Sequence, residues 1–533
     1  MPMQKNELQI DVLGTSIIIS AEEEPEYLDK LLDTFRRAIG NVQQKSGLKD
    51  PLKTAILTGF LLCDELEKAG KPHAALAPAQ SIASNEAMKI ALGMISRLDD
   101  VLPDIPESTK SQAVPQSPAE KKPAALPVFK LENTVKNYAW GSTESIPAFL
   151  GKKNVSRVPW AELWMGVHPG GPSRIAKTGS SETQPLLSEM IDKDITAFLG
   201  EITAVAFGKL PFLFKVLAAA KPLSIQAHPG PEQAREGFER ENRERIPLDA
   251  PARNYRDPNH KPEILCALEP FAALCGFRAA AETSYLLEIF SQESEGILKL
   301  ELQRLLSSLS EDDNPYKAFL TALYRLGDEV CYTLGRYIKA NCSLLVQDFP
   351  EYRDEWQLCS YLADLFPEDP GLLAPLYLNI VKLEKGEAIY LPSGVLHSYI
   401  HGMGIELMAD SDNVLRGGLT SKHINEEELL RILDFSAYKP EILKAPPPNL
   451  PYFSYPTPAE EFTLSVMQGQ NNPVSYNEGV PAIVLITEGT AIVSEEGDDF
   501  EMPLSKGESA FISAASRLVF HGSFTAYIAS CRS

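Results

Sequence analysis

The stretch EKGEAIYLPSGVLHSYIHGMGIELMADSDNVLRGGLTSKH, residues 384–423, decides how the rest of the chain is interpreted. A short strand is predicted over 388–391, and a Pro-Ser-Gly turn then leads into a second strand that carries His397 and Tyr399. Because side chains alternate along a strand, these two residues are expected on one face. Glu406 follows in the same stretch, so several chemically capable side chains are expected close to one hairpin.

The chain is long enough for several domains. At 533 residues it exceeds what one hydrophobic core usually covers, so two to four domains are expected. Residues 103–127 are rich in Pro, Ser, Lys and Ala and show no apolar periodicity, so they are interpreted as a linker. Residues 1–102 precede it as a small α/β module. Strands are predicted there over 7–21, around Gly14, and helices over 25–47, 52–69 and 84–98.

After the linker the sequence predicts a mainly β fold with a helical insertion. Strand-like segments dominate 128–278 and 373–444, whereas apolar residues recur at helical spacing over 279–372. Residues 445–533 alternate as strands again. Two segments, one beginning at Lys382 and the other at Pro503, share a sequence pattern. Each contains Lys-Gly-Glu, then two strand residues, and ends with His-Gly. This repeat predicts two barrels of one kind, of which the second has Arg517 or a neighbour in place of His397.

Composition disfavours some classes of partner. Seventy-two acidic and 50 basic residues give a net charge of −22, which argues against nucleic acid or an anionic membrane surface as the general partner. The seven cysteines form no CxxC pair and are expected to be reduced thiols. The first residues lack the apolar core of a signal peptide, and no run approaches the roughly 18 apolar residues that span a bilayer. The protein is therefore expected in the cytoplasm.

Four side chains in separated segments offer donor atoms of the kinds that a catalytic zinc site uses. Gln226 and His228 lie two apart on a predicted strand, Glu263 follows in NYRDPNHKPE, and His397 lies in the opening stretch. Catalytic zinc takes nitrogen and oxygen donors and keeps one position open. Each residue alone is a weak signal, because a single histidine or a surface glutamate more often has a structural role.

Several motifs together resemble the type I mannose-6-phosphate isomerases, or phosphomannose isomerases, which are zinc enzymes with a cupin-like barrel. The motifs are NYAWGS, PWAELWMGVHPGGPS, SIQAHPG, NYRDPNHKPE and the stretch from YLPSG to TSKH, in the family's order over about residues 128–425. The resemblance implies a cupin-like, jelly-roll catalytic domain over 128–278 and 373–444 and a second cupin-like barrel over 445–533. The departures are Gly230, Ser393, Gly417 and Ser421, and none of them removes a candidate ligand.

The resemblance also implies site residues. One Zn²⁺ per chain would be bound by Gln226, His228, Glu263 and His397, and the substrate would be a hexose 6-phosphate. Arg416 would lie at the catalytic centre. The other implied or candidate pocket residues are Ser224, Lys261, Glu406, Lys422, Tyr399 and Asp412.

The reaction that the resemblance implies sets requirements for these residues. Interconversion of mannose 6-phosphate and fructose 6-phosphate moves a proton between C2 and C1 through a cis-enediol, so negative charge on the oxygens must be stabilised. Glu406, His260 and Lys261 are the candidate bases, and Glu406 has the alternative role of orienting Arg416. The phosphate needs a compact group of donors, for which Lys422, Lys261 and Ser224 are suited.

The amino-terminal module resembles the ZapA-like family, small proteins associated with the bacterial cell-division ring. The resemblance covers about residues 7–70 and includes the strand motif IDVLGTSIIISA. In that family the helices form a dimer or tetramer through a coiled coil, but Gly70 and Pro72 end the second predicted helix early here. From the resemblance, residues 1–102 are expected to support a homo-oligomer or to contact a division-ring protein. An unrelated packing module is the alternative.

Two functions of different classes fit the sequence. The first is a zinc-dependent aldose–ketose isomerase. The second is a non-catalytic, sugar-phosphate-sensing adaptor associated with the cell-division machinery. The presence of Arg416 and Glu406 beside intact candidate ligands favours the enzyme, because a sensor has no need of a base.

Overall fold

A computed structural model describes residues 6–12, 15–21, 128–177, 184–310, 314–448, 450–495 and 500–532, and the chain divides into two compact units after Glu120. In the first unit, β1 (Asn6–Val12) and β2 (Thr15–Ala21) pair antiparallel, and Val12 lies opposite Thr15 at the turn. The predicted hairpin is therefore confirmed. The helices predicted over 25–47, 52–69 and 84–98, and the linker 103–127, lie outside the described residues.

The larger sheet of the second unit carries the candidate site. Its main path runs β11-β10-β13-β7-β5-β4, and β8, β9, β12 and β14 pair beside it. The strands are β4 (Thr134–Lys136), β5 (Glu162–Met165), β7 (Phe212–Ala219), β8 (Ile225–Ala227), β9 (Glu263–Ala267), β10 (Phe271–Phe277), β11 (Leu378–Leu383), β12 (Ala388–Leu391), β13 (His397–Ala409) and β14 (Leu415–Gly418).

Strand β7 shows how the sequence builds this sheet. All eight of its residues are buried, as expected for a strand covered on both faces. Phe212, Phe214 and Val216 point into the hydrophobic core, whereas Leu213 and Lys215 line a cavity on the other face. One face of the strand therefore supports the fold and the other builds the site.

The smaller sheet follows the path β15-β16-β21-β18-β20-β3-β6, with β17 on β21 and β19 on β18. The strands are β3 (Phe129–Glu132), β6 (Arg174–Ile175), β15 (Tyr452–Ser454), β16 (Thr463–Gln470), β17 (Val474–Tyr476), β18 (Ala482–Glu495), β19 (Glu501–Ser505), β20 (Ser509–Ile512) and β21 (Leu518–Ser530). The predicted repeat is visible in it, because β20 and β21 have the same lengths as β12 and β13. Strand β21 begins with Leu518 where β13 begins with His397.

The two sheets share one hydrophobic core. Phe214 and Ile405 of the larger sheet belong to the same buried cluster as Leu485 and Phe511 of the smaller one. Strand β3, close to the start of the second unit, pairs with β20 near the carboxyl end of the chain. The smaller sheet is thus packed directly against the sheet that carries the site.

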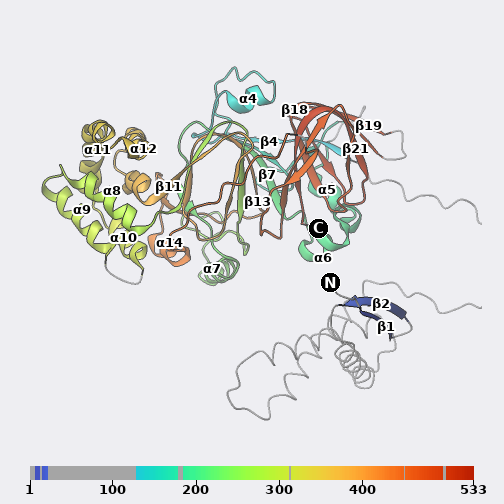
Figure 1. Ribbon diagram of the computed structural model, residues 1–533, viewed down its shortest axis with the longest axis horizontal. Coiled ribbons are helices and arrows are strands. Elements are labelled where there is room, and N and C mark those ends of the chain that lie inside the picture. Colours follow the sequence, from blue (N-terminus) through green and yellow to red (C-terminus); the bar gives the residue numbers. More distant parts are fainter. Residues whose placement is uncertain are drawn as a thin grey trace, which may run out of the picture. The chain divides into compact units, whose positions relative to one another are not determined.

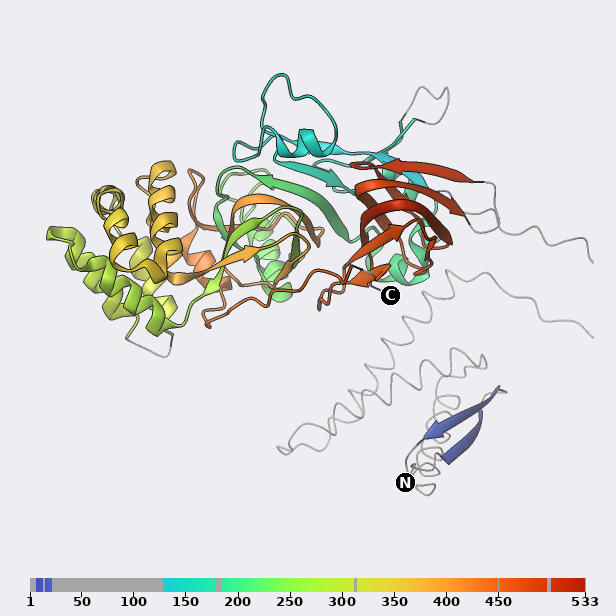
Figure 2. The ribbon, with the colours of Figure 1, turned by 45° about the horizontal axis from the view of Figure 1, so that its top comes forward.

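A group of helices packs at the end of the larger sheet that is remote from the smaller one (Figures 1 and 2). These helices are α8 (Ala280–Ser291), α9 (Gly296–Ser308), α10 (Pro315–Tyr324), α11 (Asp328–Asp348), α12 (Arg353–Leu365) and the short α13 (Ala374–Tyr377). The mainly β fold with a helical insertion is therefore confirmed. Among the helices of the described residues, none has the length and apolarity needed to cross a bilayer.

Candidate metal centre and active site

Strand pairing brings three predicted site residues into one row. Gln226 on β8 lies opposite His397 on β13 and opposite Arg416 on β14. Neighbouring strands are about 5 Å apart, so residues in register are close in space although they are far apart in sequence. The sheet thus places an imidazole, an amide and a guanidinium side by side.

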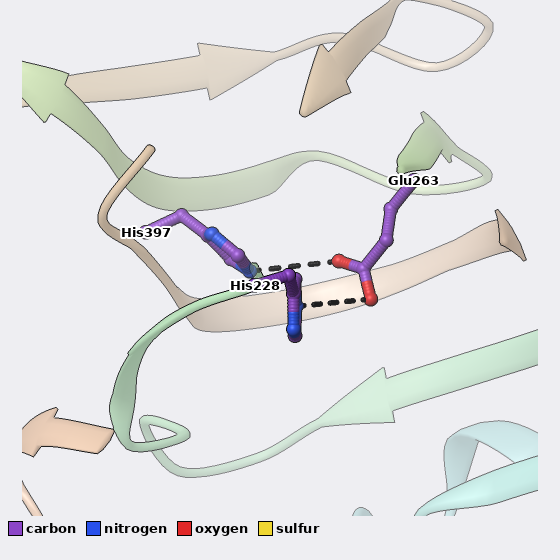
Figure 3. Close-up of side chains that lie close together, drawn as sticks. All are labelled: His228, Glu263 and His397. Carbon is purple, nitrogen blue, oxygen red and sulfur yellow. Dashed lines mark ion pairs between the residues drawn. The ribbon is translucent and has the colours of Figure 1, made fainter. Parts of the chain in front are cut away.

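His228, Glu263 and His397 converge on a single point. The Nε2 atom of His228 lies 3.3 Å from Glu263 Oε1, and the Nε2 atom of His397 lies 3.5 Å from Glu263 Oε2. Figure 3 shows the three side chains reaching toward one another from separate segments of the backbone. All three are buried, and one potential ligand atom from each lies within 4.8 Å of the other two. A group of this size and composition can hold one metal ion.

Hydrogen bonds on the far side of each ring orient the two imidazoles. His228 Nδ1 donates to the Asn413 carbonyl at 2.7 Å, and His397 Nδ1 donates to the Val395 carbonyl at 3.0 Å. Because a carbonyl only accepts, the proton of each neutral ring is on Nδ1, and the lone pair of Nε2 faces Glu263. Both rings are therefore held in the form that binds a metal through Nε2.

The charges around this group favour ligands in their metal-binding protonation states. Burial, and then the nearby Lys261 ammonium, lowers the pKa of His228 to about 4. Lys261 Nζ lies 3.0 Å from Glu263 Oε1. Although burial opposes it, Lys261 and then His228 hold the pKa of Glu263 well below its usual range. The site therefore presents a neutral His228 and an ionised carboxylate.

The residues present fit a divalent cation. His228 Nε2 and Glu263 Oε2 are buried and have no hydrogen-bond partner among the described residues. Buried polar atoms normally have partners, so two such atoms facing one point indicate a missing ligand. The Gln226 amide lies against the same point, with its Nε2 3.3 Å from His397 Nε2. A half-turn of that amide presents its oxygen instead.

The metal-binding group opens onto a cavity of about 830 Å³. Eight of the residues predicted from the sequence line it, namely Ser224, Gln226, Lys261, Glu263, Glu406, Asp412, Arg416 and Lys422. His228 and His397 lie behind this wall, in contact with Glu263. A cavity of this volume accommodates a small phosphorylated sugar.

His260 and Tyr399 lie elsewhere. His260 Nε2 is 2.6 Å from Glu461 Oε1, in the segment between β15 and β16 of the smaller sheet, and His260 is not among the cavity-lining residues. Tyr399 is almost fully buried and packs edge-on against Phe271 in the core. Neither side chain is among those that line the cavity.

A buried charged cluster on the cavity wall was not predicted from the sequence. Lys215 Nζ donates to Glu406 Oε2 at 2.6 Å and lies 3.9 Å from Glu162 Oε1, while Trp164 Nε1 donates to Glu162 Oε2 at 2.6 Å. Although burial opposes it, the two carboxylates raise the pKa of Lys215, and burial raises the pKa of Glu162. Lys215 could have been suspected, because a charge inside an apolar strand is buried only when it is paired.

Part of the cavity wall is cationic. Burial, and then repulsion from Arg256, lowers the pKa of Arg416. Burial, and then Arg416 and Arg256, lowers the pKa of Lys422. Arg256 also lines the cavity, although it was not predicted as a site residue. Three cations that repel one another beside a cavity, in a chain of net charge −22, form a place where an anion is stabilising.

Comparison with known proteins gives two family matches. The family described as phosphomannose isomerase type I, catalytic domain, matches residues 128–280, and the family described as cell division protein ZapA matches residues 8–99. Both resemblances predicted from the sequence are thereby confirmed.

Curated relatives and solved structures agree with the first match. The chain is 40% identical over 390 residues to the mannose-6-phosphate isomerase of Salmonella typhimurium, covering 72% of this chain and 94% of that protein. It is 32% identical over 414 residues to the human mannose-6-phosphate isomerase, covering 73% and 94%. The crystal structure of the Salmonella enzyme bound to fructose 6-phosphate and zinc has a TM-score of 0.69, with 37% identity over 76% of this chain and 100% of that one. This chain therefore belongs to the type I mannose-6-phosphate isomerase family.

Proposed function

We propose that this protein interconverts mannose 6-phosphate and fructose 6-phosphate with one zinc ion per chain. The observation that carries the proposal is the buried group of His228, Glu263 and His397 beside a partly cationic cavity, in which His228 Nε2 and Glu263 Oε2 have no hydrogen-bond partner among the described residues. The solved Salmonella enzyme binds zinc and fructose 6-phosphate. Its similarity to this chain gives the substrate class.

The proposed zinc ligands are His228, Glu263, His397 and the side-chain oxygen of Gln226. Three of them are already directed at one point, and Gln226 is in register with His397. A zinc ion held there supplies a Lewis acid that stabilises negative charge on the C1 and C2 oxygens of the sugar. Because no ligand is a thiolate, the ion keeps most of its positive charge for the substrate.

Arg416 and Glu406 are the proposed reacting groups of the protein. Arg416 lies next to Gln226 in the strand register, so its guanidinium can donate to the oxygen on which charge develops. Glu406 lines the cavity and accepts a hydrogen bond from Lys215, which fixes the position of its carboxylate. We assign to Glu406 the transfer of the proton between C2 and C1. The other candidate base, Lys261, forms an ion pair with Glu263.

Lys422 is the proposed binding group for the phosphate, and Arg256 joins it. Both cations line the cavity close to Arg416. Besides burial, Arg256 lowers the pKa of Arg416, and Arg416 lowers the pKa of Lys422. Ser224 lines the same cavity and adds a hydroxyl donor, and Asp412 is assigned to the sugar hydroxyl groups. The phosphate is then held by Lys422 and Arg256, and the reacting carbons lie beside the metal ligands.

The experiment is a coupled assay for fructose 6-phosphate with and without a zinc chelator. We expect turnover that the chelator abolishes and added zinc restores. His397→Ala should lose the zinc. Its activity should fall by more than about 10–100-fold, which is the loss when a residue that only supports a metal ligand is removed. His401→Ala is the matched control, because His401 is exposed on the same strand. Absent or chelator-insensitive turnover would leave only the sensing adaptor.

Residues 1–102 are proposed to join copies of the isomerase or to bind a division-ring protein. The match to the ZapA family over residues 8–99 supports this role. We also assign the protein to the cytoplasm, because the six cysteines in the described part of the chain are free and buried, as is usual in a reducing compartment.

A further inference from the structure

Asn413 joins the metal-binding group to the loop that carries Arg256. It lies between β13 and β14 and is completely buried. Its backbone carbonyl accepts the hydrogen bond from His228 Nδ1 that fixes the imidazole. Its side chain contacts the loop between α7 (Pro231–Arg243) and β9. One residue therefore contacts both the proposed metal ligand His228 and the backbone of Arg256.

The side-chain amide of Asn413 is fully used by that loop. Its Oδ1 accepts from Arg256 N at 2.7 Å and from Asp257 N at 3.3 Å. Its Nδ2 donates to the Asp257 carbonyl at 2.8 Å and to the Asn259 carbonyl at 2.9 Å. Because donors meet acceptors in one orientation only, neither an amide flip nor an aspartate satisfies the same partners.

These hydrogen bonds fix the backbone from which Arg256 enters the cavity. The loop consists of irregular backbone, which would otherwise have several conformations available. Arg256 lines the cavity close to Arg416 and Lys422. A displacement of about 1 Å in a positioning group is enough to weaken binding and turnover.

We propose that Asn413 is a positioning residue, which holds the backbone of Arg256 at a fixed distance from the metal ligand His228 so that the phosphate and the reacting carbons are bound together. The inference rests on the proposed function. It predicts that the side chain of Asn413 acts on phosphate binding, whereas its carbonyl, which every substitution retains, acts on the metal ligand.

The test compares Asn413→Asp and Asn413→Ala with the wild type in the full-length, zinc-loaded protein. We expect KM for mannose 6-phosphate and the inhibition constant of inorganic phosphate to rise by about tenfold or more. The zinc content should stay at one per chain, and kcat should change less than KM. Asn472→Asp is the matched control, because Asn472 is exposed in the turn between β16 and β17.

A double-mutant cycle identifies the partner. If Asn413 acts through Arg256, then Arg256→Ala combined with Asn413→Asp should have the KM of Arg256→Ala alone. Effects that multiply, an unchanged KM in Asn413→Asp, or loss of zinc in both Asn413 variants would overturn the inference. Failure of both variants to fold would also overturn it, because Asn413 would then serve global stability.

A separate measurement keeps this inference distinct from the proposed function. Binding of inorganic phosphate to the zinc-loaded wild type and to Asn413→Asp can be followed by calorimetry without turnover. Weaker phosphate binding in the variant supports the positioning role even if the wild type does not isomerise the sugar. Equal binding contradicts it even if the wild type does.

Discussion

At the scale of single residues, Lys215 is a buried charge stabilised by its partners. Its side chain is 6% exposed, and its ammonium lies between Glu406 and Glu162. Removing a charge from water is unfavourable by several kcal/mol unless close opposite charges and hydrogen bonds compensate. The arrangement fixes the Glu406 carboxylate on the wall of the cavity, where it can reach a molecule bound there.

Glu406→Gln should therefore abolish proton transfer and spare the metal. We expect kcat to fall by about 10²–10⁴-fold, the range for loss of a general base, with an unchanged zinc content. Incorporation of solvent deuterium at C2 of the sugar measures the step directly. Glu162→Gln is the matched control, because Glu162 lines the same cavity near the same lysine. An equal loss in that control, or full activity in Glu406→Gln, would contradict the assignment.

The donor atoms of the site could be predicted from the sequence, but their partners could not. His228, Glu263 and His397 lie in motifs whose residue types indicate metal binding. The pairing of Lys215 with Glu406 joins residues 191 positions apart, and no local pattern indicates it. No local pattern indicates the bond between His260 and Glu461 either. This bond engages His260, which the sequence alone suggests as a base.

At the scale of elements, strand β13 brings two side chains to one site that simple alternation would place on opposite faces of the sheet. His397 and Glu406 differ in parity, so a regular strand would direct them to opposite sides of the sheet. The register on β10 shifts between Ala272, opposite His401, and Ala273, opposite Tyr399. This bulge adds one residue to β13, and both side chains then serve one site. Period-2 reasoning does not predict a bulge.

Gly402, next to the bulge, should not tolerate a side chain. Its φ is +126°, and a Cβ there would lie 2.7 Å from both the Phe271 ring and the Pro270 carbonyl. We expect Gly402→Ser to lower the free energy of unfolding by about 1–3 kcal/mol and to weaken zinc binding. Urea denaturation and metal titration measure the two effects.

The control for that prediction is Gly327→Ser. Gly327 has a φ of −75° at the start of α11, and nothing lies within 4 Å of a Cβ built there. Serine is also a favourable residue at a helix start, so stability should be kept. Equal stability of the two variants would show that the bulge region is not constrained as described.

At the scale of the whole molecule, the isomerase part is one compact unit and the amino-terminal segment is another. In the second unit, β3 pairs with β20 across about 380 residues, and the two sheets share a core. The repeat of β12 and β13 in β20 and β21 could be predicted from sequence motifs, but the pairing of β3 could not, because it joins distant segments. The smaller sheet therefore supports the site structurally.

Removal of residues 1–127 should leave the catalytic activity intact and change the assembly. We expect kcat and KM of the truncated chain to match the full-length protein, because all proposed site residues lie in the second unit. Light scattering should show a larger particle for the full-length chain than for the truncated one. The same number of chains in both particles would contradict the proposed oligomerisation role.

The most direct measurement is the anomalous scattering of zinc in crystals of the metal-loaded protein. The account predicts one peak per chain, with atoms of Gln226, His228, Glu263 and His397 at about 2.0–2.2 Å from it. A peak at any other position, or the absence of a peak at this one under zinc-saturating conditions, would contradict the account.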